Sequence, residues 1–238
     1  MSTSHAPSLL TTNKILNALS RKDYPALFAN LQRVHFPRGK VLYELGERID
    51  YNFFVMSGMI SVLAITEDGS TTEICMIGNE GVAGVSALLG VNEAPYRMEV
   101  QIPGNGMRIR TTVLIEEFGR DGLLRDLTMR YTHSLILQIS QSAACNRFHS
   151  IQQRLCRWLL VARDRVKSDT LHLTQEALSH MLGANRTNVT AAAQILKSAG
   201  LIEYSRGSIR ILDRNELQSA ACECYHAVNA HLGYSHAA

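Results

Sequence analysis

The sequence lacks the apolar segments that carry a chain into or across a membrane. It has no run of about 18 consecutive apolar residues, the length that a transmembrane helix needs. Its first residues also lack the basic segment and short apolar run of a secretory signal. We therefore expect a cytoplasmic protein without a membrane partner.

Motifs of common enzyme classes are also missing. The chain has no His-Glu-x-x-His zinc motif, no nucleophile elbow, no phosphate-binding Gly-Lys loop and no carboxylate pair in a recognisable setting. His133, His149 and His180 lie in segments that are expected to be helical, and we interpret them as helix-surface residues rather than general bases. We therefore expect that the protein is not an enzyme.

Cysteine is sparse, with five residues in an odd, scattered set that lacks paired metal-ligand spacing. Cys222 and Cys224 form the only close pair, in a segment expected to be helical. Side chains two residues apart on a helix point about 200° apart, so one metal ion could not easily bind both thiols. The expectation is no metal and no cofactor, with structural or incidental thiols favoured over a redox switch.

The 238 residues suffice for two modest domains, and their charge is unevenly distributed. Residues 145–214 carry 11 lysines and arginines against five acidic residues, a net charge of +6, whereas the rest of the chain is at −3. A basic C-terminal half beside a nearly neutral N-terminal half is typical of a sensor joined to a domain that faces a polyanion.

The N-terminal half alternates apolar and polar residues in short runs. After a polar tail and short helical patterns in residues 1–35, six such runs, separated by Gly, Asp-Gly and Pro-Gly turns, extend to about residue 115. This pattern favours a small antiparallel barrel or roll over a parallel α/β sheet. We predict an α+β protein with a β-roll sensor domain over residues 36–120.

A long helix is predicted over residues 121–148, because the segment has no proline and no glycine after its start. It carries one apolar stripe and a neighbouring one with Ile136 and Ile139, which suits a helix that packs on its own roll and on a second copy of the chain. A helix that packs on one side only is an equally open alternative. The predicted dimerisation residues are Leu124, Leu127, Tyr131, Leu135 and Gln138.

The C-terminal domain is predicted over residues 149–238. An amphipathic helix over 151–166 turns Leu155, Trp158, Leu159 and Ala162 inward and is expected to expose four arginines. A final helix is expected to begin at the capping box of Asp213 and Glu216 and to run to about Ala227. The arginines expected on the outer face are Arg154, Arg157, Arg163 and Arg165.

Residues 173–212 are the most informative part of the sequence. Thr174 can cap a helix that ends at Gly183, and Asn185 can cap a second helix whose Val189, Ala193 and Leu196 share one apolar face. The run after Ala199-Gly200 alternates around a glycine turn, as a wing does. A packing-only helical hairpin is the alternative, but the coincidence of these features favours a winged helix-turn-helix that binds double-stranded DNA.

The outer side of the second helix carries short hydrogen-bonding or cationic groups that can enter a major groove. Arg206 in the wing and Gln175 are expected to contact phosphates, with solvated surface as the alternative for both. The predicted DNA-binding residues are Thr174, Gln175, Asn185, Arg186, Thr187, Thr190, Ala191, Gln194, Lys197, Arg206 and Ser208.

The order of roll, long helix and winged helix-turn-helix resembles the Crp/Fnr family of bacterial transcription regulators, over about residues 36–212. The motifs that carry the resemblance are Gly39-x-x-Leu42-x-x-x-Gly46-Glu47, Phe53-Phe54-Val55-x-x-Gly58, and Thr174-Gln175-Glu176 with Gly183, Arg186 and Val189. The resemblance implies a cyclic-nucleotide-binding-like roll, a homodimer on a palindromic operator, and RNA polymerase as a further partner.

Three departures from the family's motifs change what the resemblance implies. Val85 stands where cyclic-AMP-binding members have a glutamate, and leaving a ribose hydroxyl unpaired costs ~1–3 kcal/mol. Arg97 is followed by Met98 instead of Ser or Thr. Thr187 and Ala191 replace family reader residues, although Arg186 is kept. We therefore expect cyclic AMP control to be absent and the operator to differ from the cyclic AMP type.

An iron–sulfur oxygen sensor is not expected either, since no cysteine precedes Cys75. Arg97 is an anion-binding candidate, with an exposed strand arginine as the alternative. The predicted effector-binding residues are Gly84, Val85, Ser86, Tyr96, Arg97 and Ser140. Together these features predict a sequence-specific transcription regulator with an unidentified effector. The rival hypothesis is a ligand sensor that acts through protein partners and has a vestigial DNA-binding domain.

Overall fold

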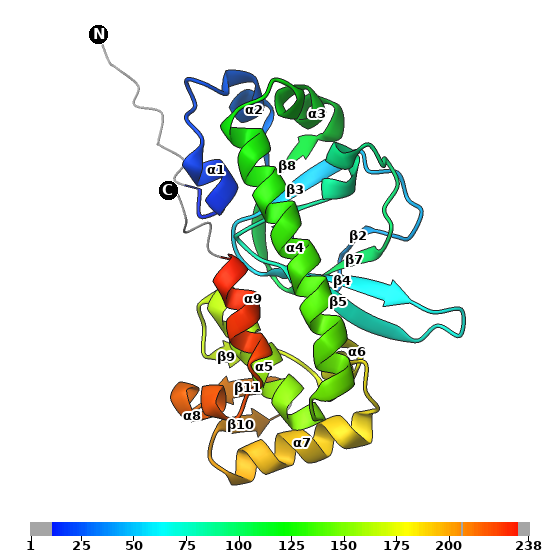
Figure 1. Ribbon diagram of the computed structural model, residues 1–238, viewed down its shortest axis with the longest axis vertical. Coiled ribbons are helices and arrows are strands. Elements are labelled where there is room, and N and C mark those ends of the chain that lie inside the picture. Colours follow the sequence, from blue (N-terminus) through cyan, green and yellow to red (C-terminus); the bar gives the residue numbers. More distant parts are fainter. Residues whose placement is uncertain (1–10, 206, 233–238) are drawn as a thin grey trace.

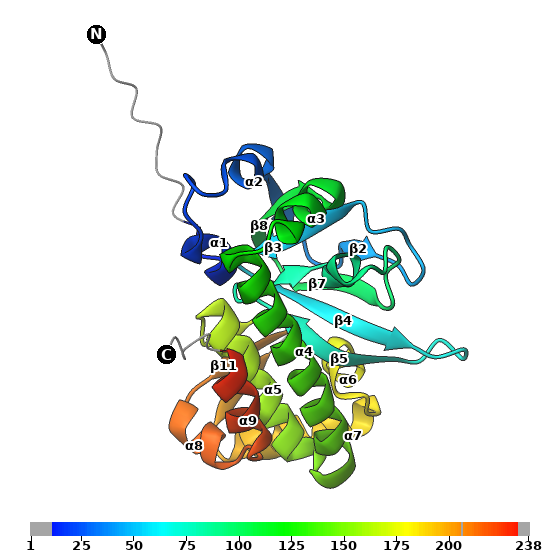
Figure 2. The ribbon, with the colours of Figure 1, turned by 45° about the horizontal axis from the view of Figure 1, so that its top comes forward.

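In the computed structural model, which describes residues 11–205 and 207–232, a β-roll and a helical domain are joined by one long helix (Figure 1). The long helix α4 passes along both parts, and the two views agree on this arrangement (Figures 1 and 2). Within the described residues, no helix combines the length and apolar character needed to cross a lipid bilayer. The polar tail predicted for about residues 1–12 lies largely outside the described part.

Two short helices, α1 (Lys14–Ala18) and α2 (Pro25–Asn30), precede the roll. The side chain of Asn13 caps α1 by accepting from the Leu16 amide, and its amide group donates to the carbonyls of Val55 and Gly81 at 2.9 and 2.8 Å. Pro25 occupies the first position of α2, where its missing N–H costs nothing.

The roll consists of two four-stranded antiparallel sheets in the orders β1-β8-β3-β6 and β2-β7-β4-β5. A 3-10 helix, η1 (Val85–Leu89), follows β6. The strands are β1 (Gln32–Phe36), β2 (Val41–Tyr43), β3 (Tyr51–Val55), β4 (Met59–Ile65), β5 (Thr71–Ile77), β6 (Val82–Ala83), β7 (Arg97–Ile102) and β8 (Gly104–Arg110). This confirms the predicted α+β class with its N-terminal roll.

The ends of the roll differ from the prediction. β1 begins at Gln32, inside the segment assigned to the tail and short helices. The last predicted strand ends at Arg110, and residues Thr111–Gly119 form helix α3. Thr111, Leu114 and Glu117 are buried, and their spacing of three residues is helical, so packing overrides the β preference of the Thr-Thr-Val run.

Helix α4 (Leu123–Phe148) is present as predicted, but its assigned dimerisation stripe is wrong. All five side chains are at most 9% exposed in the single chain, and the four apolar ones belong to the core of the roll. Gln138 is buried because its side-chain amide bonds to the backbone of Met76. These residues, which the roll of the same chain covers, are Leu124, Leu127, Tyr131, Leu135 and Gln138.

The C-terminal domain is a winged helix-turn-helix with a three-stranded sheet in the order β10-β11-β9. The expected single final helix is divided into α8 and α9, and Cys222 lies in the turn between them. The elements are α5 (Ile151–Val166), β9 (Thr170–Leu171), α6 (Gln175–Leu182), α7 (Arg186–Ser198), β10 (Ile202–Ser205), β11 (Ser208–Ile211), α8 (Arg214–Ser219) and α9 (Cys224–Leu232).

The arginine-rich outer face predicted for α5 is absent, because three of its four arginines are buried. Arg165 forms an ion pair with Glu80 at 2.9 Å, and both side chains are nearly inaccessible. Arg154 donates to the carbonyl of Leu182, and Arg157 is also buried. Only Arg163 reaches the surface, where it pairs with Asp169. Arg165 and Arg154 are therefore buried because Glu80 and the Leu182 carbonyl, both distant in the sequence, provide them with partners in the interior.

The roll and the helix-turn-helix share one hydrophobic cluster. Met59, Leu63 and Met76 from the roll pack with the apolar faces of α5, α6 and α7. Within this cluster the indole N–H of Trp158 donates to Glu73 Oε1 at 2.7 Å, and the hydroxyl of Ser61 donates to Glu73 Oε2. The two parts of the chain are therefore packed together and not merely tethered.

Candidate nucleic-acid interface

The helix-turn-helix forms through the local chemistry that its sequence predicts. The Thr174 hydroxyl accepts from the Ala177 amide at 3.1 Å and begins α6, while the Asn185 side chain accepts from the Asn188 amide at 2.8 Å and begins α7. Between the helices Gly183 has a φ of +52°, in the left-handed region that favours glycine. Two caps and one turn thus fix the start of α7.

Helix α7 divides into a buried and an exposed face. Val189, Ala192, Ala193 and Leu196 are at most 5% exposed and pack into the shared cluster. On the opposite side a shallow hollow is lined by Arg186, Thr187, Thr190, Ala191 and Gln194. The structure therefore brings five of the predicted DNA-binding residues together on one surface.

Two predicted contacts have a structural role as well. The Thr190 hydroxyl lies 3.1 Å from Gln175 Oε1 and 2.8 Å from the Arg186 carbonyl, so it links the two helices. The side-chain oxygen of Gln175 thereby accepts from Thr190. Sequence reasoning missed this link because nothing in the spacing of Gln175 and Thr190 requires it.

The remaining residues predicted to contact DNA lie at the end of α7 and in the wing. Lys197 is exposed in the last turn of α7, and Ser208 is half-buried at the start of β11. Arg206 lies outside the described residues. Arg210 on the wing is paired with Glu203 at 2.8 Å. Within the described part of the chain, Arg186 and Lys197 have no ion-pair partner, and α7 has no acidic residue. The two charged side chains of α7, one at each end of the helix, are therefore both cationic and exposed.

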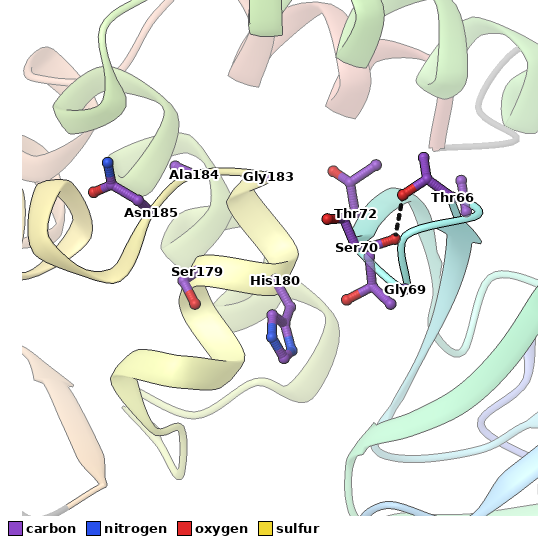
Figure 3. A pocket seen from close by; sticks show the side chains of 11 residues that line it. Thr66, Gly69, Ser70, Thr72, Ser179, His180, Gly183, Ala184 and Asn185 are labelled. Atoms are coloured by element: carbon purple, nitrogen blue, oxygen red, sulfur yellow. Dashed lines mark hydrogen bonds between the residues drawn. The ribbon is translucent and has the colours of Figure 1, made fainter.

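The turn between α6 and α7 lies against the β4–β5 hairpin of the roll. Figure 3 shows the hairpin residues Thr66, Ser70 and Thr72 facing His180 and Gly183 across a pocket of about 440 Å³. A Cβ atom on residue 183 would lie 2.6 Å from Thr72 Oγ1, so the approach depends on glycine. The sensor domain is therefore in direct contact with the element that positions α7.

The predicted effector residues do not form a single site within this chain. Tyr96 and Arg97 line a small hollow with Leu45 and Leu63. Gly84 is buried, and Val85, in η1, packs against the core of the roll next to half-buried Ser86. Ser140 is exposed; it lies two residues from buried Gln138, about 200° around α4, and therefore faces away from the chain's own roll. The six predicted effector residues therefore lie in three separate places: the hollow beside Tyr96 and Arg97, the segment 84–86 at η1, and the outer side of α4 at Ser140.

Arg97 already has acidic neighbours. Its guanidinium lies 3.2 Å from Glu99 and 3.8 Å from Glu44, and its side chain is 31% exposed. An incoming phosphate would have to compete with two carboxylates. The interior of the roll is occupied by packed aromatic rings, with Phe53 5.8 Å from Tyr43 and 6.2 Å from Phe36 between centroids.

A β-roll joined through a long helix to a winged helix-turn-helix defines a DNA-binding regulator with a ligand-sensing type of N-terminal domain. Comparisons with known proteins agree with this class. Models of two families match the chain: a cyclic nucleotide-binding domain over residues 33–109 and a Crp-like helix-turn-helix domain over residues 153–220. Together these matches cover more than half of the sequence, and the chain belongs to the Crp/Fnr family of transcription regulators, not to an enzyme family.

Individual relatives support the assignment. The chain is 24% identical over 225 residues to a CRP-like cAMP-activated global transcriptional regulator of Mycobacterium tuberculosis, covering 90% of this chain and 98% of the relative. Its fold is similar to that of FixK2 from Bradyrhizobium japonicum (TM-score 0.69, 16% identity, 81% and 98% coverage). It is also similar to a CRP/FNR-family regulator from Thermus thermophilus (TM-score 0.66, 20% identity, 80% and 98% coverage). The predicted family and DNA-binding function are thus confirmed.

Proposed function

We propose that this regulator acts as a homodimer that reads a palindromic operator through the exposed face of α7. The observation that carries the proposal is the surface formed by Arg186, Thr187, Ala191 and Gln194 on a helix fixed at its start by the Asn185 cap. An arginine near the start of such a helix suits a bidentate contact with guanine, and Thr187 or Ala191 suits a thymine methyl group. The two half-sites would lie about 34–36 Å apart.

The exposed side of α4 supports a dimer seam along the neighbouring apolar stripe with Ile136 and Ile139, and not along the five residues predicted for dimerisation. Met129, Ile136 and Ala143 are exposed at intervals of seven residues, and Ile139 lies three residues after Ile136. This is the a and d spacing of a two-stranded coiled coil. Met129, Ile136 and Ile139 are 47%, 57% and 37% exposed, which is unusual for apolar side chains on one stripe. Ser140 would lie beside this seam, next to the partner subunit.

An effector of the roll would act by changing the position of α7. The hairpin that contacts the α6–α7 turn belongs to the roll, so a ligand that favours one hairpin position would shift the population of DNA-binding conformations. The mycobacterial relative is described as cAMP-activated. We propose a different effector here, because Val85 offers no acceptor and Arg97 is paired with Glu99 and Glu44. Contact with RNA polymerase is part of the same proposal.

Selection of DNA from a random pool tests the function. The wild-type chain is expected to enrich a palindrome, and Arg186→Ala is expected to lose about 1–3 kcal/mol of discrimination at one base pair of each half-site. The matched control is Lys197→Ala, which removes one charge from the far end of α7 and should weaken binding to all sequences equally. Unchanged selectivity in Arg186→Ala, or no enrichment by the wild type, would contradict the proposal.

A further inference from the structure

Three of the five cysteines and one histidine meet where α4 ends and α9 begins. The sulfur atoms of Cys145, Cys222 and Cys224 and a ring nitrogen of His149 all lie within 4.8 Å of one another. Cys145 is in the last turn of α4, His149 is its C-cap residue, and Cys224 opens α9. The three cysteines form a small buried cluster of their own.

This arrangement corrects two expectations from the sequence. Cys222 precedes α9 and is not part of it, so its thiol and that of Cys224 converge instead of pointing apart. His149 is not a helix-surface residue, since its side chain is only 15% exposed. His133 and His180 are exposed on their helices, as expected.

The distances suit a single tetrahedral ion. Cys145 Sγ lies 3.5 Å from Cys222 Sγ, and Cys224 Sγ lies 3.4 Å from His149 Nδ1. With zinc–sulfur bonds of about 2.3 Å and zinc–nitrogen bonds of about 2.0 Å, the ligands of one tetrahedral zinc ion lie roughly 3.5–3.8 Å apart. An iron–sulfur cluster needs its cysteines further apart, because several irons and sulfides lie between them.

The surroundings of the cluster also fit a bound cation. His149 Nε2 lies 3.2 Å from Glu223 Oε1, so the carboxylate fixes the tautomer in which Nδ1 is free to bind a metal. Gln141 Nε2 donates to Cys224 Sγ at 2.9 Å. Three thiolates around one divalent ion carry a net negative charge, and the buried Arg154 and Arg157 both interact electrostatically with Cys145.

We propose that Cys145, His149, Cys222 and Cys224 bind one zinc ion in a closed, structural site. Four protein ligands leave no open position for a substrate, which is the arrangement of structural zinc. The ion would join the end of the dimer helix, the connection to α5, and the start of the C-terminal helix. It would thereby fix the C-terminal domain to α4. Metal binding itself does not depend on the proposed operator or dimer.

Metal content and cobalt spectroscopy test the site in the full-length protein. Protein purified under reducing conditions is expected to contain one zinc ion per chain. After removal of zinc with a chelator, titration with Co²⁺ is expected to give the intense visible bands of a tetrahedral cobalt–thiolate site, saturating at one equivalent. This titration uses the wild type and is independent of whether any variant folds.

Variants assign the ligands. Cys224→Ser and His149→Ala are expected to lower zinc affinity more than tenfold, and Glu223→Ala by about 10- to 100-fold because it orients His149. Cys75→Ala, a buried cysteine in the core of the roll, is the matched control and should retain one zinc ion. The proposal would be overturned by metal-free protein that gives no cobalt bands, by a Cys145–Cys222 disulfide in place of metal, or by iron and sulfide in equal amounts.

Discussion

Replacing Glu73 with glutamine should flatten the pH dependence of stability, because Glu73 is a buried carboxyl between the two domains. It is 7% exposed. Burial raises its pKa from the ordinary value of 4.5 to about 7, even though Ser61, Trp158, Arg157 and Arg165 act in the opposite direction. The carboxyl is therefore close to half-protonated at neutral pH, at the contact between β5 and α5.

The magnitude follows from the difference between the folded and unfolded pKa. One pKa unit corresponds to about 1.4 kcal/mol, so Glu73 changes the free energy of unfolding by about 3 kcal/mol. Because the folded pKa is the higher one, the folded state binds more protons between pH 4.5 and 7. The contribution of Glu73 is therefore fully present below pH 4.5 and is lost as the pH rises through about 7.

Urea unfolding of the wild type and Glu73→Gln between pH 5 and 8 measures this effect. Glutamine keeps an oxygen that can accept from Trp158 and an amide that can bond to Ser61, but it cannot ionise. We expect the variant to gain about 2–3 kcal/mol relative to the wild type over this range. Fluorescence of the single tryptophan, Trp158, reports the same titration. Glu67→Gln, an exposed carboxyl on the same hairpin, controls for loss of charge. Parallel pH profiles for wild type and Glu73→Gln would refute the reasoning.

Three further predictions concern other parts of the molecule. Arg165→Met should lower the free energy of unfolding by about 3–5 kcal/mol, because it breaks the buried Arg165–Glu80 ion pair by removing one partner; a loss below about 1 kcal/mol in urea titrations would contradict this. Ile136→Glu should weaken dimerisation at least tenfold in sedimentation experiments without lowering monomer stability, since Ile136 is 57% exposed; Phe148→Glu, at a 78% exposed position of the same helix outside the a and d spacing, serves as the control. Cyclic AMP at millimolar concentration should produce no heat in calorimetry and no rise in Tm, because Val85 cannot accept from a ribose hydroxyl; a clear rise in Tm would show that the roll binds it in another way.

Local chemistry accounts for what the sequence predicts well. The caps Thr174 and Asn185, the turn at Gly183 and the uninterrupted α4 depend on neighbouring residues, and each is present in the structure. The exposed face of α7 follows from the same helical periodicity. The helix-turn-helix and its exposed surface were therefore predictable in detail.

Features that depend on distant partners were not predictable in this way. Arg165 is buried by Glu80, which lies 85 residues away, so its position on α5 gave no sign of burial. Of the two apolar stripes of α4, the one that contains the residues predicted for dimerisation is covered by the roll, and the stripe with Ile136 and Ile139 is exposed. Cys145 and Cys222 are 77 residues apart. The sequence did contain a local indication of a metal site, since Cys145 and His149 are one helical turn apart. Two ligands do not define a site, however, and the other two come from Cys222 and Cys224 only because α9 packs against the end of α4.

The shared hydrophobic cluster also limits how this protein can be taken apart. Trp158, Leu159 and Leu178 contact the cluster that Met59 and Met76 complete from the roll. A fragment that begins near Ser150 would leave these side chains facing water, and a chimera with a foreign sensor would need a complementary surface in place of β4 and β5. The β-roll and the C-terminal DNA-binding domain should therefore unfold as one cooperative unit. Over evolutionary time their contacting residues are constrained to change together, so the two domains are not exchanged as independent modules.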